Sequence, residues 1–241
     1  MRTAVVVMSK IPQPGFTKTR LNTVLTGQES ADFHLACLKD ICSAIKMSGL
    51  PGYIYYAAPD EALFPTPHSI EADLWGWSSE DRAYFKMYPQ QGADLGERLY
   101  HAAREILNDY EAVLLLGSDM PEITPELIWE AQANLSNSEI TIGPALDGGY
   151  YLLGIKQASP YIFQNIPWGT AEVFNITLQR IRTNLIRYSV LPPKMDIDTW
   201  DDLKTFCIGS QTDEDNSIRY LAAYKMATAL VTKYSAPRKG V

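Results

Sequence analysis

The 241-residue sequence has few cysteines and few basic residues, and both shortages narrow the range of functions. The three cysteines, Cys37, Cys42 and Cys207, have neither the spacing of zinc ligands nor a CxxC pair, so we expect buried free thiols in a reducing compartment. Lysine and arginine number 21 against 28 acidic residues, which gives a net charge of -7. Nucleic-acid and anionic-membrane binding need a cationic surface, so we expect neither partner.

The sequence also lacks a long apolar run. The run from Ala4 to Met8 is too short for the core of a signal peptide, and no segment approaches the roughly 20 apolar residues of a membrane-spanning helix. We therefore expect a soluble, cytoplasmic protein. No repeat, low-complexity segment or linker divides the chain, so we expect one domain over residues 1–241, in which 210–241 form a C-terminal helical extension.

Apolar strands and amphipathic helices alternate along the chain and predict an α/β fold. The β-branched run at 3–8 indicates a buried parallel strand, and a capping box at Thr26 and Glu29 predicts a helix that ends at Gly49. A second strand is expected at 52–58. Strand, helix and strand in this order are typical of a right-handed crossover, so we expect a single, mainly parallel (mixed) sheet flanked by helices.

The remaining expected elements alternate in the same way after an irregular stretch at 60–91. They are helices at 94–108, from Thr124, from Thr170 to 182, at 199–207 and at 213–232, and strands at 112–116, 139–142, 150–155 and 186–190.

The loop after the first strand, residues 9–20, combines three cations with a turn shaped by proline and glycine. Lys10, Lys18 and Arg20 follow the carboxyl end of a strand, which is where open α/β sheets bind their ligands. Such cations suit a di- or triphosphate, and the alternative is a solvated basic turn. The loop has neither the P-loop pattern nor GxGxxG, which disfavours a Walker-type ATPase and an NAD-dependent oxidoreductase.

A carboxylate stands at the tip of the apolar strand at 112–116. Gly117 and Ser118 lead from this strand to Asp119, and Pro121 turns the chain away. Hard divalent cations that bridge nucleotide phosphates bind such carboxylates, so Asp119 is a candidate metal ligand. The alternative is an aspartate that only shapes a turn or caps a helix.

Asp147 precedes two glycines, Gly148 and Gly149. The glycines allow the backbone to approach a ligand closely, and Asp147 could accept hydrogen bonds from sugar hydroxyls. From the residues alone we favour a tight turn between two strands. Tyr150 and Trp168 lie near these candidates and could stack on a base or sugar, although aromatic residues more often pack in a core.

Asp196 and Asp198 would lie on the same side of an extended segment. One of them could complete a metal site with Asp119. Equally, Asp198 and Thr199 could cap a helix. The three histidines show no ligand spacing, and we assign them no role.

These segments occur in one order that resembles a known family. Residues 10–21, KIPQPGFTKTRL, resemble the K-x-P-x-P-G-x-x-K-T-R-L opening of a bacterial family of proposed glycosyltransferases, long known as a domain of unknown function. The later blocks of that family resemble 91–98, 117–121, 144–151, 166–168 and 196–199. The resemblance runs from about residue 4 to about residue 205, so the tail beyond 210 is left for packing or homodimer formation.

That family is similar to the GT-A, or nucleotide-diphospho-sugar transferase, superfamily. The resemblance implies a metal-dependent transferase that uses Mg²⁺ or Mn²⁺ and binds a nucleotide or nucleotide sugar and a small acceptor. The implied metal ligands are Asp119 and Asp198, with Asp196 less favoured; the implied catalytic residues are Lys18, Asp119 and Asp147; the implied binding residues are Lys10, Lys18, Arg20, Gly117, Ser118, Gly148, Gly149, Tyr150 and Trp168.

The implied reaction is glycosyl transfer from a nucleoside-diphosphate sugar to the acceptor. A nucleotidyltransferase, which joins an NTP to a phosphorylated small molecule and releases pyrophosphate, would use the same residues. A non-catalytic nucleotide-sugar-binding module is the third possibility. The sequence departs from the family at Gly169, where Ser or Thr is usual, and at Met120, where a smaller residue is commoner.

Overall fold

The computed structural model describes residues 1–59, 78–212 and 217–236. Within them, seven strands form one sheet in the order β3-β2-β1-β4-β6-β5-β7. The strands are β1 (Thr3–Lys10), β2 (Gly52–Ala57), β3 (Phe85–Pro89), β4 (Ala112–Gly117), β5 (Ile140–Pro144), β6 (Tyr150–Ile155) and β7 (Tyr188–Val190).

Strand direction in the sheet is parallel except at β6. The strands β3, β2, β1 and β4 run parallel to one another, β6 is antiparallel to β4 and β5, and β7 is parallel to β5. The predicted mainly parallel, mixed sheet is therefore confirmed. Because β1 and β4 are parallel neighbours, the loops that follow them meet at one edge of the sheet.

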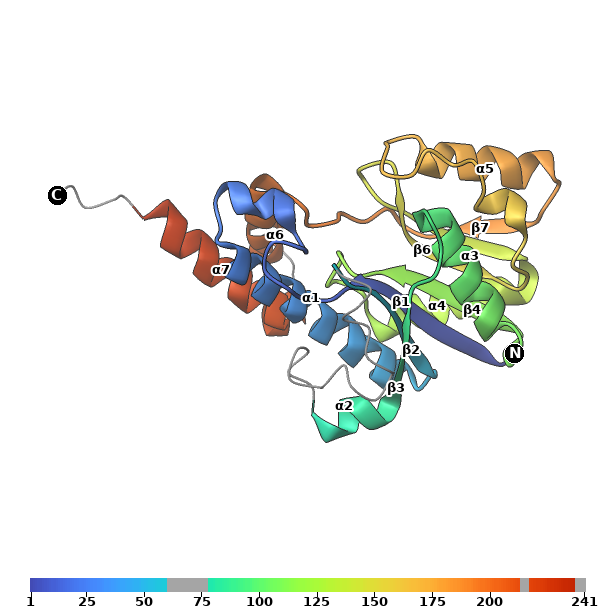
Figure 1. The fold of residues 1–241 in the computed structure, drawn as a ribbon, viewed down its shortest axis with the longest axis horizontal. Coiled ribbons are helices and arrows are strands. Elements are labelled where there is room, and N and C mark those ends of the chain that lie inside the picture. Colours follow the sequence, from blue (N-terminus) through green and yellow to red (C-terminus); the bar gives the residue numbers. More distant parts are fainter. Residues whose placement is uncertain (60–77, 213–216, 237–241) are drawn as a thin grey trace.

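Helices cover both faces of the sheet (Figure 1). They are α1 (Gly27–Ser48), α2 (Ser79–Tyr84), α3 (Leu95–Ile106), α4 (Pro125–Asn137), α5 (Val173–Thr183), α6 (Trp200–Thr212) and α7 (Ala222–Ser235). Alternate side chains of β1 point to opposite faces: Val5 and Val7 pack with α1 and α4, whereas Ala4 and Val6 pack with α3 and α5. This two-sided burial is the reason that β1 reads as an uninterrupted apolar run.

Side-chain caps start α1, α3 and α4, and the sequence analysis predicted those at Thr26 and Thr124. At α1, Thr26 and Glu29 form the reciprocal capping box, and Gly49 ends the helix with a φ of 73°. Asp94 caps α3, and Thr124 caps α4. These caps fix the ends of the helices that flank the strand tips at the site edge.

Three predicted helix boundaries are wrong: the starts of α5 and α7, and the end of the helix predicted at 199–207, which as α6 continues to Thr212. Thr170 does not cap α5, because its hydroxyl donates to the Pro167 carbonyl and closes a turn, and α5 begins at Val173. The predicted tail helix begins only at Ala222, because the Asp40 carboxylate accepts the N–H groups of Ala222 and Ala223 at 2.8 Å each. The part of this prediction at 213–216 lies outside the described residues.

The stretch at 60–91 was expected to be irregular, but its second half contains α2 and β3. Residues 60–77 lie outside the described part. The strand β3 pairs with β2 at one end of the sheet order, and only Phe85 of its residues is fully buried. An edge strand of this kind shows little apolar alternation, which is why its sequence pattern is weak.

The C-terminal helices form a third cluster away from the sheet (Figure 1). Phe33 and Cys37 of α1 pack there against residues of α6 and α7, together with Leu21 at the end of residues 10–21, which we call the opening loop. We propose on this basis that residues 1–241 form one domain, with the tail as an extension that stabilises α1. Among the helices described, none is both long and apolar enough to cross a membrane.

Candidate active site

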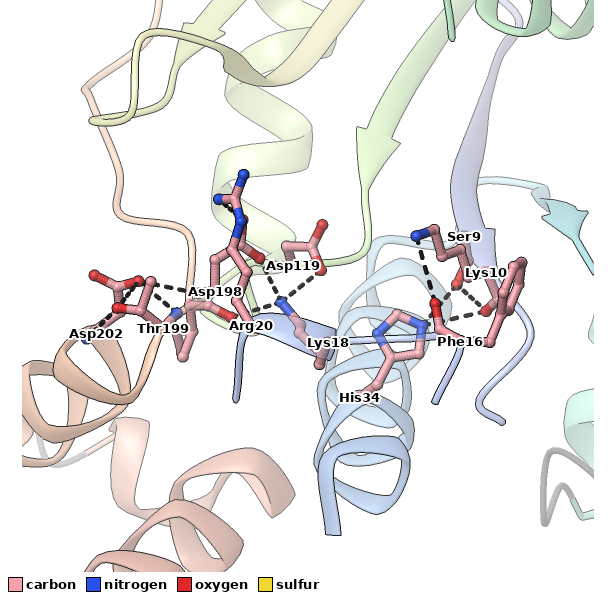
Figure 2. A network of polar contacts seen from close by, with 11 residues as sticks. Ser9, Lys10, Phe16, Lys18, Arg20, His34, Asp119, Asp198, Thr199 and Asp202 are labelled. Atoms are coloured by element: carbon pink, nitrogen blue, oxygen red, sulfur yellow. Dashed lines mark hydrogen bonds and ion pairs between the residues drawn. The ribbon is translucent and has the colours of Figure 1, made fainter. Parts of the chain in front are cut away.

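The candidate site forms where β1 and β4 end side by side. Met8 pairs with Gly117 at the last rung of this parallel pair, so the opening loop and Asp119 emerge together. The segment that precedes α6 reaches the same edge, where the Ile197 N–H donates to the Asp119 carbonyl at 3.1 Å. Figure 2 shows the resulting polar network, in which Lys18 lies between Asp119 and Asp198.

The Lys18 ammonium is buried and has three acceptors. Its Nζ lies 2.5 Å from Asp119 Oδ1, 2.6 Å from the Ile197 carbonyl oxygen and 3.3 Å from Asp198 Oδ1. Burial works to lower the pKa of Lys18, but the negative charges around it, that of Asp119 foremost, together outweigh burial and raise the pKa above its ordinary value. An ammonium has three N–H groups, so a phosphate can reach Lys18 only by replacing one of these acceptors.

Asp119 is open to solvent on one side, since 44% of its side chain is exposed. Burial of the rest works to raise its pKa, yet the Lys18 ammonium holds the pKa of Asp119 below its ordinary value. Asp198 also contacts Arg20, whose Nη1 lies 3.3 Å from Asp198 Oδ2. The two predicted metal ligands therefore converge on one cation, which in this structure is the Lys18 ammonium.

A pocket of about 550 Å³ extends from Asp119 over the opening loop; we call it the cationic pocket. Lys10 and Arg20 line it, as predicted for a phosphate site, and Arg20 is 68% exposed. Arg98 of α3 lines it as well, held by a 3.1 Å hydrogen bond from its Nε to the Gly92 carbonyl. Arg98 had no predicted role, although it lies inside the family-like block at 91–98.

A second pocket of about 260 Å³ lies on the other side of Asp119; we call it the acidic pocket. Its charged lining residues are Asp119, Asp147 and Asp196, and none of its lining residues is Lys or Arg. Its remaining lining includes the predicted residues Gly117, Ser118, Gly149, Tyr150 and Trp168, and also Gly169. Asp119 lines both pockets and so stands between a cationic and an acidic space.

Asp147 combines the two alternatives that its sequence left open. Its Oδ1 accepts the Gly149 N–H at 2.8 Å, which forms the expected tight turn, and the exposed side chain also lines the acidic pocket. Gly148 lines neither pocket. Its φ is 92°, and an added Cβ would lie 2.1 Å from the Ala171 carbonyl oxygen, so packing explains this glycine.

Asp196 and Asp198 face different pockets. Asp196 lines the acidic pocket, where burial, with the nearby charges of Asp119 and Asp147, raises its pKa to about 7. Asp198 lines the cationic pocket. The cap of α6 is made by Thr199 with Asp202, so the Asp198 carboxylate is left to pair with cations.

The donor set suits a hard divalent cation. Asp119 and Asp198 offer carboxylate oxygens around one cation position. Burial, with the neighbouring charges of Asp119 and Asp147, raises the pKa of Asp196, and a cation bound nearby would lower it again. Within the described residues, no three His, Cys, Asp or Glu side chains are arranged to hold a metal by themselves. Two carboxylates fit Mg²⁺ or Mn²⁺ when substrate phosphate oxygens and water complete the shell, provided that Lys18 withdraws.

His34 is a site residue that the sequence analysis missed. Its Nε2 lies 3.1 Å from Ser9 Oγ and 3.2 Å from the Lys10 carbonyl oxygen, so it holds the start of the opening loop (Figure 2). Burial lowers the pKa of His34 to about 4, which keeps the imidazole neutral at pH 7. The available signal was its place on the buried stripe of α1, four residues from Ser30 and from Leu38.

An aromatic wall closes the acidic pocket. Tyr150 and Trp168 meet edge to face, with ring centroids 6.1 Å apart. Trp168 packs directly over Gly96 of α3, where an added Cβ would lie 2.4 Å from Trp168 Nε1. The family-atypical Met120 is buried in the core under α4 and takes no part in the wall.

Comparison with known proteins identifies the family. Residues 55–170 match the family described as "Uncharacterized protein conserved in bacteria (DUF2064)". The structure is also similar to that of a proposed nucleotide-diphospho-sugar transferase from Desulfovibrio desulfuricans G20, with a TM-score of 0.84, 30% identity and coverage of 97% of this chain and 98% of that chain. The chain therefore belongs to the DUF2064 family of nucleotide-diphospho-sugar transferase-like proteins. The family and the transferase class that the resemblance implied are thereby confirmed.

More distant structures share the fold alone. A CMP:2-keto-3-deoxy-manno-octonic acid synthetase complexed with CTP has a TM-score of 0.52 at 10% identity, over 88% of this chain and 99% of that chain. A cytidylyltransferase from Leptospira borgpetersenii has a TM-score of 0.51 at 12% identity, over 100% and 99%. No curated protein matches the chain in sequence. The fold of this DUF2064 member is thus also that of nucleotidyltransferases.

Proposed function

We propose that the protein is a metal-dependent glycosyltransferase that transfers a sugar from a nucleoside-diphosphate sugar to a small acceptor. The observation that carries the proposal is the position of Asp119 between the cationic and the acidic pocket. A nucleotide sugar also has two parts of different charge, because its diphosphate is anionic and its sugar is a neutral polyol. The bond that breaks lies between these two parts, so it would lie next to Asp119.

The cationic pocket would bind the diphosphate. Lys10, Arg20 and Arg98 supply three cations, and Arg20 and Arg98 can each donate two parallel hydrogen bonds to phosphate oxygens. Asp119 and Asp198 would hold Mg²⁺ or Mn²⁺, which when bound offsets charge on the leaving diphosphate. Lys18 would then give up a carboxylate and donate to phosphate in its place. Its role would be electrostatic, because most of the catalysis is positioning and charge compensation.

The acidic pocket would bind the sugar and the acceptor. The Asp147 oxygen not used in the turn can accept a hydrogen bond from a hydroxyl group, and Asp196 lies close enough to Asp147 and Asp119 for their charges to affect its pKa. Tyr150 and Trp168 offer an apolar surface on which a ring can pack. One face of the ligand would therefore meet carboxylates and the other would meet aromatic side chains.

Nucleotidyl transfer from an NTP remains the alternative, and a non-catalytic binding module is the third. A cytoplasmic location is part of the proposal, since the three cysteines are free and suit a reducing compartment. Homodimer formation through the tail stays a prediction.

A thermal-shift panel tests the proposal. Nucleoside diphosphates, triphosphates and nucleotide sugars are each added with and without Mn²⁺, and a ligand at 100 times its Kd stabilises by about 2.7 kcal/mol. We expect metal-dependent stabilisation by one set of diphosphates and nucleotide sugars, followed by metal-dependent release of the diphosphate from the matching nucleotide sugar. Stabilisation without turnover would favour the binding module. Release of pyrophosphate from a triphosphate would favour nucleotidyl transfer.

A further inference from the structure

The charges of the two pockets differ in a way that bears on the acceptor. The cationic pocket contains Lys10, Arg20 and Arg98, whereas the acidic pocket contains three carboxyl groups and no Lys or Arg. The two pockets meet at Asp119, which lines both. An anionic group is therefore stabilised on one side of Asp119 and repelled on the other.

The nearest cation cannot reverse the charge of the acidic pocket. Lys18 lines the cationic pocket and is not among the lining residues of the acidic pocket. Its Nζ is 2.5 Å from Asp119 and its side chain is only 2% exposed. Lys18 thus offsets part of the negative charge of Asp119 from the side of the cationic pocket. The lining of the acidic pocket contains no cation that could do the same for Asp147 and Asp196.

The other wall of the acidic pocket is apolar. Leu95, Leu99 and Val173 line it together with the aromatic pair Tyr150 and Trp168. Leu95, at the start of α3, is 42% exposed and lines the cationic pocket as well, so it lies at the junction of the two pockets. A ligand that fills this space should have an apolar part on one side and hydrogen-bond donors on the other.

We infer that the acceptor is a phosphate-free hydroxyl or amine compound with an apolar part, and not a phosphate ester. This inference rests on the proposed function, because it assigns the acidic pocket to the acceptor side of the reaction. It separates the two candidate reactions, since nucleotidyl transfer to a phosphorylated molecule would bring a phosphate group into a pocket that contains the carboxyl groups of Asp119, Asp147 and Asp196 and no Lys or Arg. A hydroxyl or ammonium group, in contrast, donates to carboxylates.

Three compounds with one ring and different head groups test the inference: benzyl alcohol, benzylamine and benzyl phosphate. Each is titrated into the nucleotide-free protein labelled with 5-fluorotryptophan, and ¹⁹F NMR follows the Trp168 resonance, assigned with Trp168→Phe. We expect benzyl alcohol and benzylamine to shift this resonance with Kd values at least about tenfold lower than that of benzyl phosphate.

A gain-of-binding variant supplies the matched control. Thr170 is exposed and lines the acidic pocket but not the cationic one, so Thr170→Lys adds a cation to the acidic pocket alone. Thr170→Gln also removes the hydroxyl group but adds no charge. We expect benzyl phosphate to bind Thr170→Lys at least about fivefold more tightly than Thr170→Gln, while benzyl alcohol binds both equally.

Two results would overturn the inference: benzyl phosphate binding wild type as tightly as benzyl alcohol, or no response of Trp168 to either phosphate-free compound. Neither result depends on the nucleotide, because the titrations contain none. If the thermal-shift panel shows no nucleotide binding while the three compounds behave as expected, the proposed function is wrong and the charge preference of the pocket is still supported. If nucleotides bind with metal and benzyl phosphate also binds, nucleotidyl transfer is the better assignment.

Discussion

Replacement of Lys18 by methionine tests whether Asp119 and Asp198 share one cation position. Lys18→Met keeps the length and apolar stem of the side chain and removes only the ammonium that Asp119 and Asp198 share. Removal of one partner from a buried ion pair costs roughly 3–5 kcal/mol. Asp119 and Asp198 are 44% and 34% exposed and can gain water, so we expect about 3 kcal/mol here.

The assay is thermal unfolding with and without Mg²⁺. For a chain of this length, about 3 kcal/mol lowers Tm by roughly 6–12 °C. Without the ammonium, the two carboxylates should bind a divalent cation even when no nucleotide is present. Mg²⁺ at about ten times its Kd would then restore roughly 1.4 kcal/mol in Lys18→Met, whereas wild type should respond little to Mg²⁺ alone.

A second lysine provides the matched control. Lys233 lies 2.6 Å from Glu29, a similar distance, but its side chain is 62% exposed. Lys233→Met should lower Tm by less than about 4 °C, because the lysine end of the pair is exposed and the Glu29 carboxylate, which is only 16% exposed, keeps hydrogen bonds from Thr26 and Tyr234. A Lys18→Met protein as stable as wild type, or one with the same Mg²⁺ response as wild type, would refute the reasoning that Asp119 and Asp198 share one cation position.

Three further predictions concern the pocket walls and the opening loop. Gly96→Ala should destabilise the protein by more than about 2 kcal/mol in urea titrations, because its Cβ would lie 2.3 Å from the Phe163 carbonyl oxygen. Gly209→Ala should stabilise α6 by roughly 0.5–1 kcal/mol, because its Cβ would meet no other described segment of the chain within 4 Å. If both changes have the same sign, the packing argument is wrong. Burial holds the pKa of His34 near 4, so the folded state resists protonation; about 3 kcal/mol of stability present above pH 6.5 should be lost as the pH falls towards 4, and His34→Asn should lack this part of the pH dependence. A pH profile unchanged by the variant would contradict it. Asp147→Asn should keep the turn and the affinity for the plain nucleoside diphosphate, but it should weaken binding of the nucleotide sugar roughly ten- to hundredfold in paired titrations. If wild type and variant bind the nucleotide sugar equally well, Asp147 only shapes the turn.

The elements that the sequence predicted well are those with local signals. The β-branched run of β1 and the caps at Thr26 and Thr124 depend on neighbouring residues alone, and each is present in the structure. The start of α7 depends on Asp40, which lies about 180 residues earlier in the chain, so no local pattern could place it. Tertiary contacts of this kind override helix propensity.

At the candidate site, too, local features could be predicted from the sequence, whereas features that depend on tertiary contacts could not. Asp119 could be placed at a strand tip from sequence, and family resemblance joined it to Lys18 and Asp198. The sequence could not show that Lys18 has all of its N–H groups engaged, or that Asp196 and Asp198 face different pockets. Both facts depend on how the chain passes Ile197, which bonds to Asp119 through its N–H and to Lys18 through its carbonyl.

Calorimetric titration of wild type and Asp119→Asn tests the central claim most directly. The nucleoside diphosphate selected by the thermal-shift panel is titrated with and without Mn²⁺ into each protein. The amide has the shape of the carboxylate but lacks the charge that a hard cation needs, so we expect Mn²⁺ to tighten binding to wild type and to have no effect on the folded variant. A variant whose affinity depends on Mn²⁺ as strongly as that of wild type would contradict the assignment of Asp119 as the metal ligand between the two pockets.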